Sequence, residues 1–425
     1  MKKKNKKKIV IIGGGIIGCI LSSILSKNGH SVEIYDYRKK LGGILGDFEK
    51  KNFKFLRGCQ YITSNSVTHN FVNQYSKKFK SIEHIYSSYT NFFNQEFFSK
   101  KYAVPVFKVN NLDFSKLRYK KKYKKKISLK DRIDLYPNFI KKKLYSFFEN
   151  INLNPKNIDY KSYSNFQMGR IAFPEIEEKI IKLKKISIFY DDLYAVEKKM
   201  LNFKKYFQAI LPTEGYDKFF ENFEKKSIKD NIKIFKSSNV TSYWKNKKLE
   251  ISTKRKKIKN DYVIWTGNPV KLINSFLNIK LESPSFKVMQ ISANLKMNNI
   301  KDNYVQVYSN NMEILRIFIY KFNNTNKINI ETSINKSEID KEKVLNDTKK
   351  ILKRMGVIIN YDKETISFFK DIRFNIITVK DKKIIDTFNR RTKSTNLINT
   401  PWLEYGREEK LNFFIKELGK LKLVD

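Results

Sequence analysis

The feature that most constrains the fold of this chain is the run IVIIGGGIIGC at residues 9–19. Its first four residues are apolar and β-branched, which predicts a strand buried on both faces of a parallel sheet. Apolar residues at helical spacing then continue to Gly29, a residue that commonly ends helices. SVEIYD predicts a second strand that ends in Asp36. Between strand and helix stands the pattern G-x-G-x-x-G, formed by Gly13, Gly15 and Gly18.

Each residue of this pattern has a physical role in nucleotide binding. Gly13 permits a tight turn, Gly15 lets the backbone approach a pyrophosphate, and Gly18 permits close packing of helix on strand. The helix N-terminus offers free N–H groups and a positive dipole end to phosphates. Asp36, 18 residues after the last of the three glycines, can accept hydrogen bonds from a ribose. A complete βαβ unit with these parts predicts a dinucleotide site.

The lysine-rich octet before this run is also typical of an export signal or a membrane anchor. A signal peptide ends in a small-residue cleavage site, and a membrane span accommodates neither a glycine cluster nor a following strand. We therefore expect residues 1–8 to be a solvated tail, with no transmembrane segment and a cytoplasmic location.

The charge of the chain is extreme, because 87 basic and 42 acidic side chains give a net charge of +45. Such a charge is compatible with a polyanionic partner. However, lysine, asparagine and isoleucine are abundant and arginine is scarce, as an AT-rich genome produces, and nucleic-acid surfaces favour arginine. We interpret most of the charge as compositional, including the run RYKKKYKKK at 118–126, and expect no specific nucleic-acid partner.

Cysteine and histidine usage argues against disulfide and metal chemistry. The chain has only Cys19 and Cys59, no CxxC pair, and three scattered histidines. We therefore expect neither a disulfide framework nor a metal site.

A glycine doublet, Gly42-Gly43, stands six residues beyond Asp36. The whole run GGGIIGCILSSILSKNGHSVEIYDYRKKLGG resembles the N-terminal signature of the FAD-binding amine-oxidase-like flavoproteins. That resemblance implies FAD as the cofactor, with its adenosine at the acid and the doublet against the cofactor. It also implies a hairpin in DFEKKNFKFLRG that leads to Gly58 under the flavin edge, although Gly58 can also be an ordinary turn glycine.

Two middle segments carry a narrower resemblance to UDP-galactopyranose mutases. YSNFQMGR at 163–170 resembles their tyrosine-containing substrate segment, and residues 189–223 are similar to their block around YDD and GYT. Arg316 falls near the place of a diphosphate-binding arginine, with a surface or paired strand arginine as the alternative. Residues that match by type are Tyr163, Tyr190, Phe207, Pro212, Gly215 and Tyr216. The resemblance implies Arg316, Tyr163 and Tyr190 as catalytic residues.

The sequence also departs from the mutase pattern. Met168 replaces a tryptophan that offers a stacking surface, and Gln60 replaces a histidine near the flavin. The first diphosphate arginine falls near Ser187, where Lys184 or Lys185 are the available substitutes.

The C-terminal closing run of the mutases is not recognisable. In its place residues 396–418 predict a strand, a turn and a helix that starts near Gly406, suited to the pyrophosphate or pyrimidine end of the flavin.

These observations predict an α/β fold, α+β overall, with a Rossmann-like FAD-binding domain, an inserted helical region and an antiparallel-sheet substrate domain. The FAD-binding domain is expected to be discontinuous, over 1–85, 205–270 and 375–425. The helical region of the substrate site covers 86–204, and the sheet-rich substrate domain covers 271–374.

Three functions remain open at this point. The first is a mutase-like enzyme that isomerises a nucleotide sugar for cell-surface polysaccharides, by covalent catalysis with reduced FAD and no net redox change. The second is an FAD-dependent oxidoreductase of the amine-oxidase or desaturase type. The third is a non-catalytic or nucleic-acid-binding protein that uses its charge. In either enzyme the partner is a small-molecule substrate, for the mutase a UDP-sugar. The oligomeric state, including a homodimer, is left open.

Overall fold

The structure is a computed structural model of the chain. It describes residues 6–50, 52–63, 66–75, 79–90, 97–99, 127–166, 177–194, 207–254, 256–296, 303–308, 313–322, 324–334, 339–399 and 406–424. Met168 and the run at 118–126 lie outside the described residues.

The predicted βαβ unit forms the centre of a five-stranded parallel sheet. Its strand order is β19-β13-β1-β2-β9, and every neighbouring pair is parallel. The strands are β1 (Lys8–Ile12), β2 (Ser31–Tyr35), β9 (Ile232–Phe235), β13 (Tyr262–Trp265) and β19 (Leu397–Asn399). Segments far apart in the sequence thus build one Rossmann-like sheet, as the prediction of a discontinuous domain requires.

Both faces of this sheet are covered, which explains the uninterrupted apolar run of β1. Ile9 and Ile11 pack into the core under α1 (Ile16–Lys27), α8 (Tyr216–Ser227) and α12 (Arg407–Lys420). Val10 and Ile12 point to the opposite core, under α9 (Val270–Leu277) and α11 (Val379–Thr392). A small sheet of β10 (Thr241–Lys245), β11 (Lys248–Ser252) and β12 (Lys257–Ile258) also contributes to that second core.

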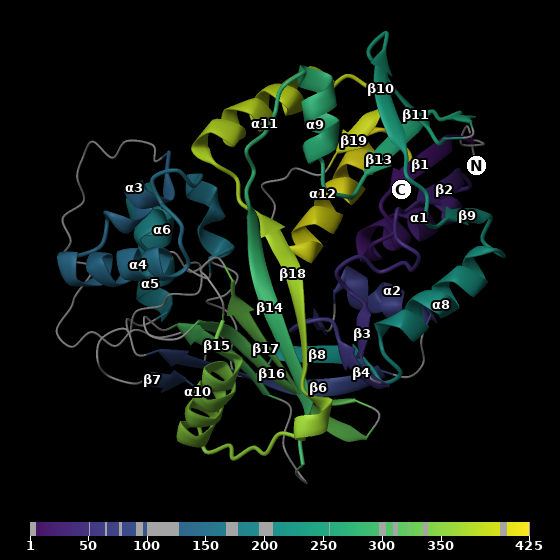
Figure 1. Cartoon of the computed structure of the whole chain (residues 1–425). Helices are drawn as coiled ribbons and strands as arrows, with labels where there is room; N and C mark the ends of the chain where they lie inside the picture. The colour runs from purple at the N-terminus through teal and green to yellow at the C-terminus, as the bar shows by residue number, and fades with distance from the viewer. Residues whose placement is uncertain are drawn as a thin grey trace.

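A nine-stranded sheet forms the second layer of the molecule (Figure 1). Its order is β18-β14-β17-β16-β15-β6-β8-β5, with β7 paired to β6, and all pairs are antiparallel except β15 with β6. The strands are β5 (Ile62–Thr63), β6 (Phe79–Thr90), β7 (Phe97–Ser99), β8 (Phe207–Pro212), β14 (Ser285–Asn294), β15 (Asn303–Tyr308), β16 (Ile314–Phe322), β17 (Thr325–Ser333) and β18 (Ser367–Asn375).

Three strands of this sheet come from segments that the predicted boundaries place in the FAD-binding domain. Residues 62–63 form β5, residues 79–85 belong to β6 and residues 207–212 form β8, and all three strands pair within the large sheet. The sheet therefore extends beyond the expected range 271–374, because the chain crosses between the two layers several times.

Within the predicted helical range 86–204, the described residues 127–166 and 177–194 are mainly helical, whereas residues 86–90 and 97–99 belong to strands β6 and β7 of the large sheet. The helical elements are α3 (Leu129–Ile133), α4 (Asn138–Asn150), the 3-10 helix η2 (Tyr160–Ser164), α5 (Glu177–Ile186) and α6 (Ile188–Leu193). We call these elements the helical body. It packs on one face of the large sheet, where Phe147 stacks on Tyr308 with 4.9 Å between ring centroids. The other face of the sheet is covered by α10 (Lys341–Arg354) (Figure 1).

A hairpin of β3 (Asp47–Lys50) and β4 (Phe53–Leu56) leads from the Rossmann-like sheet to Gly58, as predicted. The short helix α2 (Val67–Tyr75) then packs beside α8 before the chain enters β6. Within the described residues, the structure has no helix both long and apolar enough to cross a bilayer.

Candidate functional site

The glycine turn after β1 is crowded by backbone on all sides. Gly13 has φ = +111°, and its N–H donates to the carbonyl of Tyr35 at 2.9 Å. A Cβ on Gly18 would lie 2.1 Å from the carbonyl oxygen of Gly13. The first glycine is thus needed for its backbone conformation and the third for close packing of α1 on β1, the roles that the sequence predicts.

The glycine doublet lies directly against this turn. The N–H of Gly42 donates to the carbonyl of Gly14 at 2.8 Å, and Gly42 forms a parallel bridge with Gly15. Gly42 and Gly43 have φ of +114° and +63°, which L side chains rarely adopt. The structure therefore brings the doublet and the phosphate turn together, as the sequence pattern suggests.

Asp36 ends β2 beside the same turn and is 5% exposed. One carboxylate oxygen accepts the N–H of Gly14 at 2.6 Å, and the other accepts the N–H of Arg38 at 2.7 Å. Each oxygen can accept more than one hydrogen bond, so the carboxylate retains capacity for ribose hydroxyls. These amides also fix its orientation.

The N-terminus of α1 has the arrangement needed for a phosphate. Gly15 is its N-cap, and no side chain caps the free N–H groups of the first turn. Only backbone and glycine Cα atoms lie within 4 Å of where a Cβ on Gly15 would stand. The turn, the doublet, the acid and the helix end fit a dinucleotide cofactor.

Gly58 is the point where this domain meets the large sheet. It has φ = +75°, and a Cβ there would lie 3.2 Å from Nε2 of Gln290 in β14. Asn329 of β17 donates to the carbonyls of Leu56 and Gly58 at 2.8 and 2.7 Å. Tyr320 accepts the N–H of Leu56 at 3.0 Å. The segment before Gly58 is thus fixed on the sheet by buried hydrogen bonds.

A row of polar residues crosses the sheet beside Gly58. Cα pairing aligns Gln306 with Arg316, Arg316 with Glu331, and Glu331 with Gln290. Each of the four is at most 9% exposed. We call Gln290, Arg316, Glu331 and Gln306 the polar row. On one side of the polar row along the strands, residues of the sheet pack against the helical body. On the other side, residues of the sheet hold the Gly58 segment.

Glu331 organises the polar row. Its carboxylate accepts hydrogen bonds from Nε and Nη2 of Arg316 and from Nε2 of Gln290, the last at 2.9 Å. It also pairs with Nη1 of Arg373 at 2.8 Å. Burial alone raises the pKa of Glu331, but the two guanidinium groups outweigh it and lower the pKa to about 2. Arg316 also donates to the hydroxyl of Tyr304 at 3.0 Å. The carboxylate therefore stays ionised and holds both neighbours in place.

Two acceptors of the polar row remain available. Oε1 of Gln290 and Oε1 of Gln306 are buried and have no hydrogen-bond partner among the described residues. The bond from Gln290 Nε2 to Glu331 fixes which end of that amide is free, since a carboxylate only accepts. A buried unpaired acceptor costs free energy, so these oxygens mark a place for a ligand or an ordered water.

At the N-terminus of α12, Gly406 is the N-cap without a side-chain cap, as the predicted helix start requires. Arg407 donates to the carbonyl of Tyr61 at 3.3 Å. The hydroxyl of Tyr216 is buried without a hydrogen-bond partner in the described part of the chain. Burial raises the pKa of Tyr216, although the charge of Arg407 opposes this, so the hydroxyl remains a donor.

Tyr163 and Tyr190 belong to the helical body, not to the polar row. Tyr163 lies under the guanidinium of Arg132, 3.6 Å from ring centroid to Cζ, and Tyr190 packs against Phe189 and Tyr194. Arg132 is 2% exposed, and its Nε has no partner within the described residues. The structure does not place Arg316 in contact with either tyrosine, and the catalytic roles of the three residues stay predictions.

Lys184, one of the two lysines suggested as substitutes for the missing diphosphate arginine, is already bound by other residues of the helical region. Lys184 is buried, and its ammonium donates to the carbonyls of Asp191 and Tyr194 and pairs with the Asp191 carboxylate at 2.8 Å. Lys185 is exposed.

Sequence reasoning missed Gln290, Glu331, Gln306 and Arg132. For the first three a signal exists, since each is a polar residue between mostly apolar neighbours in a strand that is largely buried on both faces. Arg132 stands in a five-residue helix, where no periodicity distinguishes it.

Comparisons with known proteins agree with this geometry. A family model described as "NAD(P)-binding Rossmann-like domain" matches residues 11–76. The 4,4'-diaponeurosporene oxygenase of Staphylococcus haemolyticus is 32% identical over 92 residues, which are 21% of this chain and only 18% of that protein.

Solved structures resemble the chain over nearly its whole length. Reduced UDP-galactopyranose mutase has a TM-score of 0.67 at 11% identity, covering 98% of this chain and 96% of the other. Wild-type putrescine oxidase bound to putrescine has a TM-score of 0.53 at 9% identity, covering 98% and 99%. A fatty acid isomerase from P. acnes has a TM-score of 0.53 at 10% identity, covering 98% and 99%. At these identities the likeness is one of fold.

The glycine turn, the doublet and the acid lie together within that fold, as a dinucleotide site requires. The chain thus contains a Rossmann-like domain that matches the NAD(P)-binding family model at residues 11–76, within a fold that it shares with UDP-galactopyranose mutase and putrescine oxidase.

Proposed function

We propose that this chain is an FAD-dependent enzyme that acts on a nucleotide sugar in the manner of a UDP-galactopyranose mutase, in the synthesis of cell-surface polysaccharides. The substrate binds between the cofactor domain, the large sheet and the helical body. When bound in reduced form, FAD supplies a nucleophile for covalent catalysis without net oxidation of the sugar. The chain's own residues bind and orient the substrate.

The observation that carries this proposal is the polar row. Apolar walls would favour a lipid as the substrate, and unpaired carboxylates would favour a polyamine. Here the polar row and Tyr304 offer two amide oxygens without donors among the described residues, a guanidinium and a phenol, while the one carboxylate of the row, Glu331, is paired with Arg316 and Arg373. Sugar hydroxyls donate and accept hydrogen bonds, and they match such a surface.

The chain's residues have distinct tasks in this proposal. Gln290 and Gln306 accept hydrogen bonds from sugar hydroxyls, and Glu331 fixes Gln290 and Arg316 in place. Tyr163 and Tyr190 line the side of the substrate that faces the helical body. Burial between sheet and helices excludes water from the reacting carbon.

The test uses the purified holoprotein and UDP-galactopyranose. After reduction with dithionite we expect conversion to the furanose isomer, and no conversion with the oxidised protein. UDP should perturb the flavin absorbance spectrum. Absence of a spectral change with UDP, together with absence of product in the reduced state, would sink the mutase proposal.

A second candidate is an FAD-dependent oxidoreductase of the amine-oxidase or desaturase type. It is favoured by a specific observation: Arg316 is bound by Glu331 and Tyr304, and Lys184 by the α6 segment, so both cations predicted for a diphosphate already have partners. Turnover of an amine or a lipid by the oxidised flavin, with bleaching of its absorbance, would support this alternative.

A further inference from the structure

Helix α11 stands where the three parts of the molecule meet. At its N-terminal end Val379 donates to the carbonyl of Asn157, and Thr378 forms a bridge with Ile158, which attaches α11 to the helical body. The helix follows β18 of the large sheet directly and leads into β19 of the Rossmann-like sheet. Figure 1 shows it between α9 and the helical body.

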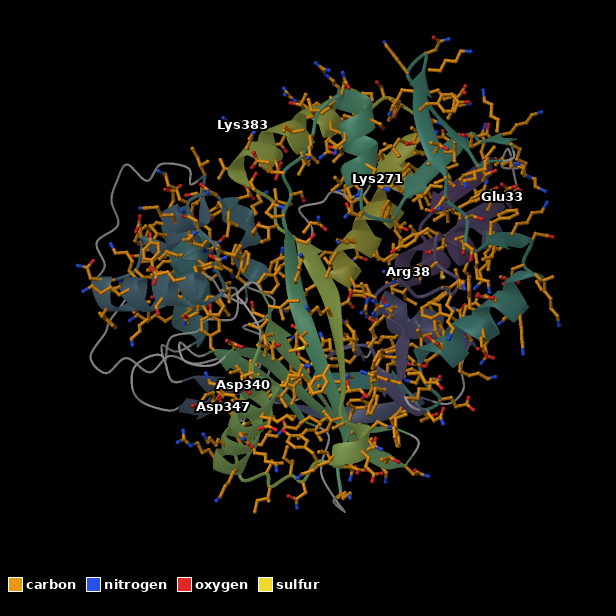
Figure 2. All side chains as sticks on the ribbon, in the orientation of Figure 1. Glu33, Arg38, Lys271, Asp340, Asp347 and Lys383 are labelled. Carbon is orange, nitrogen blue, oxygen red and sulfur yellow. The ribbon has the colours of Figure 1, made fainter. Side chains whose placement is uncertain are left out.

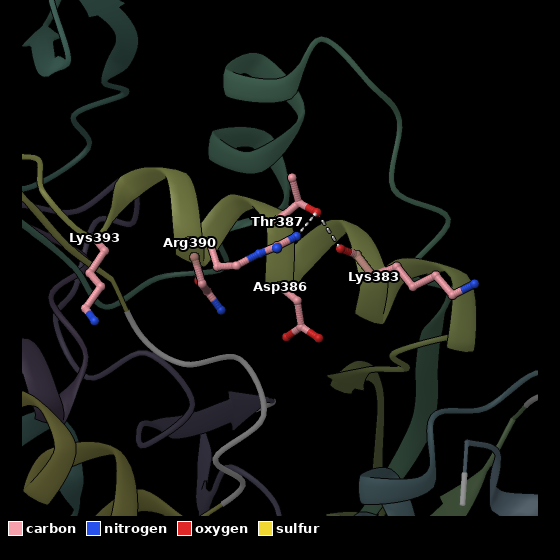
Figure 3. A pocket seen from close by; sticks show the side chains of 6 residues that line it. Lys383, Asp386, Thr387, Arg390 and Lys393 are labelled. Atoms are coloured by element: carbon pink, nitrogen blue, oxygen red, sulfur yellow. Dashed lines mark hydrogen bonds between the residues drawn. The ribbon is translucent and has the colours of Figure 1, made fainter. Parts of the chain in front are cut away.

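An open hollow of about 640 Å³ lies along this helix. Its lining residues are Lys383, Asp386, Thr387, Asn389, Arg390 and Lys393. Figure 3 shows Arg390 lying along the helix against Thr387, with Lys383 toward one end and Lys393 toward the other. The contact from Arg390 Nη2 to Thr387 Oγ1 is 3.3 Å. The hollow thus presents three cationic side chains on one helix face.

The charges of the hollow are not neutralised within the described chain. No carboxylate there pairs with Lys383, Arg390 or Lys393. The one acid of the lining, Asp386, is paired with Lys382. The hollow therefore keeps a positive charge that a bound anion would balance.

We infer that this hollow, defined by Arg390 with Lys383 and Lys393, binds the diphosphate of a nucleoside-diphosphate substrate. The inference rests on the proposed function and adds a group for the diphosphate. The two lysines stand ten positions apart on α11 and its C-cap, about 15 Å along the axis, which suits an extended nucleotide better than a single phosphate. A guanidinium binds phosphate oxygens through paired, charge-assisted hydrogen bonds, so Arg390 makes the central contact and the lysines add charge.

The neighbouring residue Arg391 provides a matched comparison. It is also exposed, lies in the same last turn and experiences the same helix dipole, but it does not line the hollow. Arg391→Gln therefore removes the same charge as Arg390→Gln. Only a specific site distinguishes these two variants, because the bulk field of a chain with charge +45 treats them alike.

Two lysines of α10, at the opposite end of the molecule, serve as a control for Lys383 and Lys393. Figure 2 marks this end by Asp340 and Asp347, and the α11 end by Lys383. Lys343 and Lys353 of α10 are exposed. The double variant Lys343→Gln/Lys353→Gln removes the same charge as Lys383→Gln/Lys393→Gln.

The experiment measures binding of UDP and of inorganic diphosphate to each holoprotein by calorimetry. We expect Arg390→Gln to raise the dissociation constant for both ligands about tenfold, the loss of one charge-assisted hydrogen bond. Arg391→Gln should change it less than about twofold, since it removes only a screened surface charge. The α11 double variant should likewise weaken binding more than the α10 double variant.

Three results would overturn the inference, and they are distinguishable from one another. If UDP binds but Arg390→Gln and Arg391→Gln weaken it equally, the hollow is not its site, and the proposed function stands. If UDP does not bind the wild-type protein, both the inference and the mutase proposal fail. A difference between the arginine variants for UDP but not for diphosphate would contradict the assignment to phosphates.

Discussion

The backbone of Gly58 lies on the side-chain amide of Gln290, so that a Cβ at position 58 would stand 3.2 Å from Nε2 and 3.3 Å from the amide carbon. The chain that leaves the cofactor domain thus rests on the sheet beside the polar row. Because the amide is fixed by Glu331 at 2.9 Å, it cannot turn away without losing that bond. This contact couples the cofactor domain to the sheet.

Substitution of Gly58 by alanine should therefore destabilise the folded protein by more than the backbone strain alone. Gly29 is the matched control, since its φ of +86° is similar but nothing lies within 4 Å of its Cβ position. Both alanine variants incur the cost of a left-handed backbone, about 1 kcal/mol or more. We expect Gly58→Ala to lower the melting temperature further than Gly29→Ala and to alter the flavin absorbance spectrum. Equal losses in the two variants would contradict this coupling.

Gly18→Ala should prevent close packing at the phosphate turn. Its Cβ would lie 2.1 Å from the carbonyl oxygen of Gly13, and both atoms belong to rigid backbone. Gly419 is the control, because it also lies in a helix but has open space at its Cβ position. Alanine at Gly419 should stabilise α12 by roughly 0.5–1 kcal/mol. The measurement is the flavin content of the purified proteins, which should be strongly reduced only in Gly18→Ala.

The geometry of the glycine turn could be predicted from sequence, and that of the polar row could not. Gly13, Gly15, Gly18 and the doublet have a fixed order over a short stretch, so local spacing is sufficient to predict their geometry. The partner of Arg316 is different. Glu331 lies on the next strand, and only the register of β16 with β17 brings the two together. Cross-strand register depends on turns and on burial of one face, which spacing along the chain does not reveal.

The domain boundaries illustrate a related difficulty. The hairpin of β3 and β4 and the start of α12 follow local patterns and lie where the sequence indicates. The parallel pairing of β6 with β15 joins residues more than two hundred positions apart. Residues 79–84 of the same strand pair with β8, more than one hundred positions away. Such long-range pairings leave no local trace, and together they explain why residues 79–85 join the large sheet.

Glu331→Gln should destabilise the protein strongly, because it leaves the buried Arg316 and the half-buried Arg373 without their carboxylate. Breaking a buried pair in this way costs about 3–5 kcal/mol. The control is Asp371→Asn, which breaks the half-exposed pair with Arg57 at 2.9 Å and should cost about 1 kcal/mol or less. The measurement is the midpoint of urea unfolding. A loss as small as that of the control would show that Glu331 does not organise the row.

The contribution of Glu331 to stability should also depend on pH. The pKa of Glu331 is lowered to about 2 in the folded protein, below its ordinary value of 4.5. Its contribution to stability is therefore complete above pH 4.5 and is lost as the pH falls toward 2. The difference in stability between wild type and Glu331→Gln should shrink over that window. A difference that stays constant down to pH 2 would contradict the lowered pKa.

Lys327 is a buried lysine whose charge is unfavourable. It is 5% exposed, donates to Oδ1 of Asn294 at 3.0 Å and lies over the ring of Phe55 at 4.6 Å. Burial lowers its pKa to about 8. Below pH 8 both the folded and the unfolded chain carry the proton, so the folded state bears the cost of a buried charge. Between about pH 8 and the ordinary value of 10.5 the folded lysine is neutral, and stability rises with pH.

Lys327→Met should therefore raise the melting temperature at pH 7, by about 2–4 °C, and the gain should diminish as the pH approaches 10. Lys248→Met, at an exposed strand position, should show no such gain. Thermal unfolding at several pH values measures both variants. A gain that is independent of pH would show that packing, rather than the buried charge, accounts for the effect.

Tyr216→Phe tests whether the cofactor completes the hydrogen bonding at the N-terminus of α12. The Tyr216 hydroxyl is buried and has no partner among the described residues, so its removal should leave the stability of the apoprotein unchanged or slightly higher. If the cofactor accepts its hydrogen bond, the same change should weaken FAD binding about fivefold to tenfold. Fluorescence titration of the apoprotein with FAD, alongside thermal unfolding without FAD, separates the two effects. Unchanged affinity with unchanged stability would place the hydroxyl outside the cofactor site, whereas a loss of apoprotein stability would reveal an internal partner.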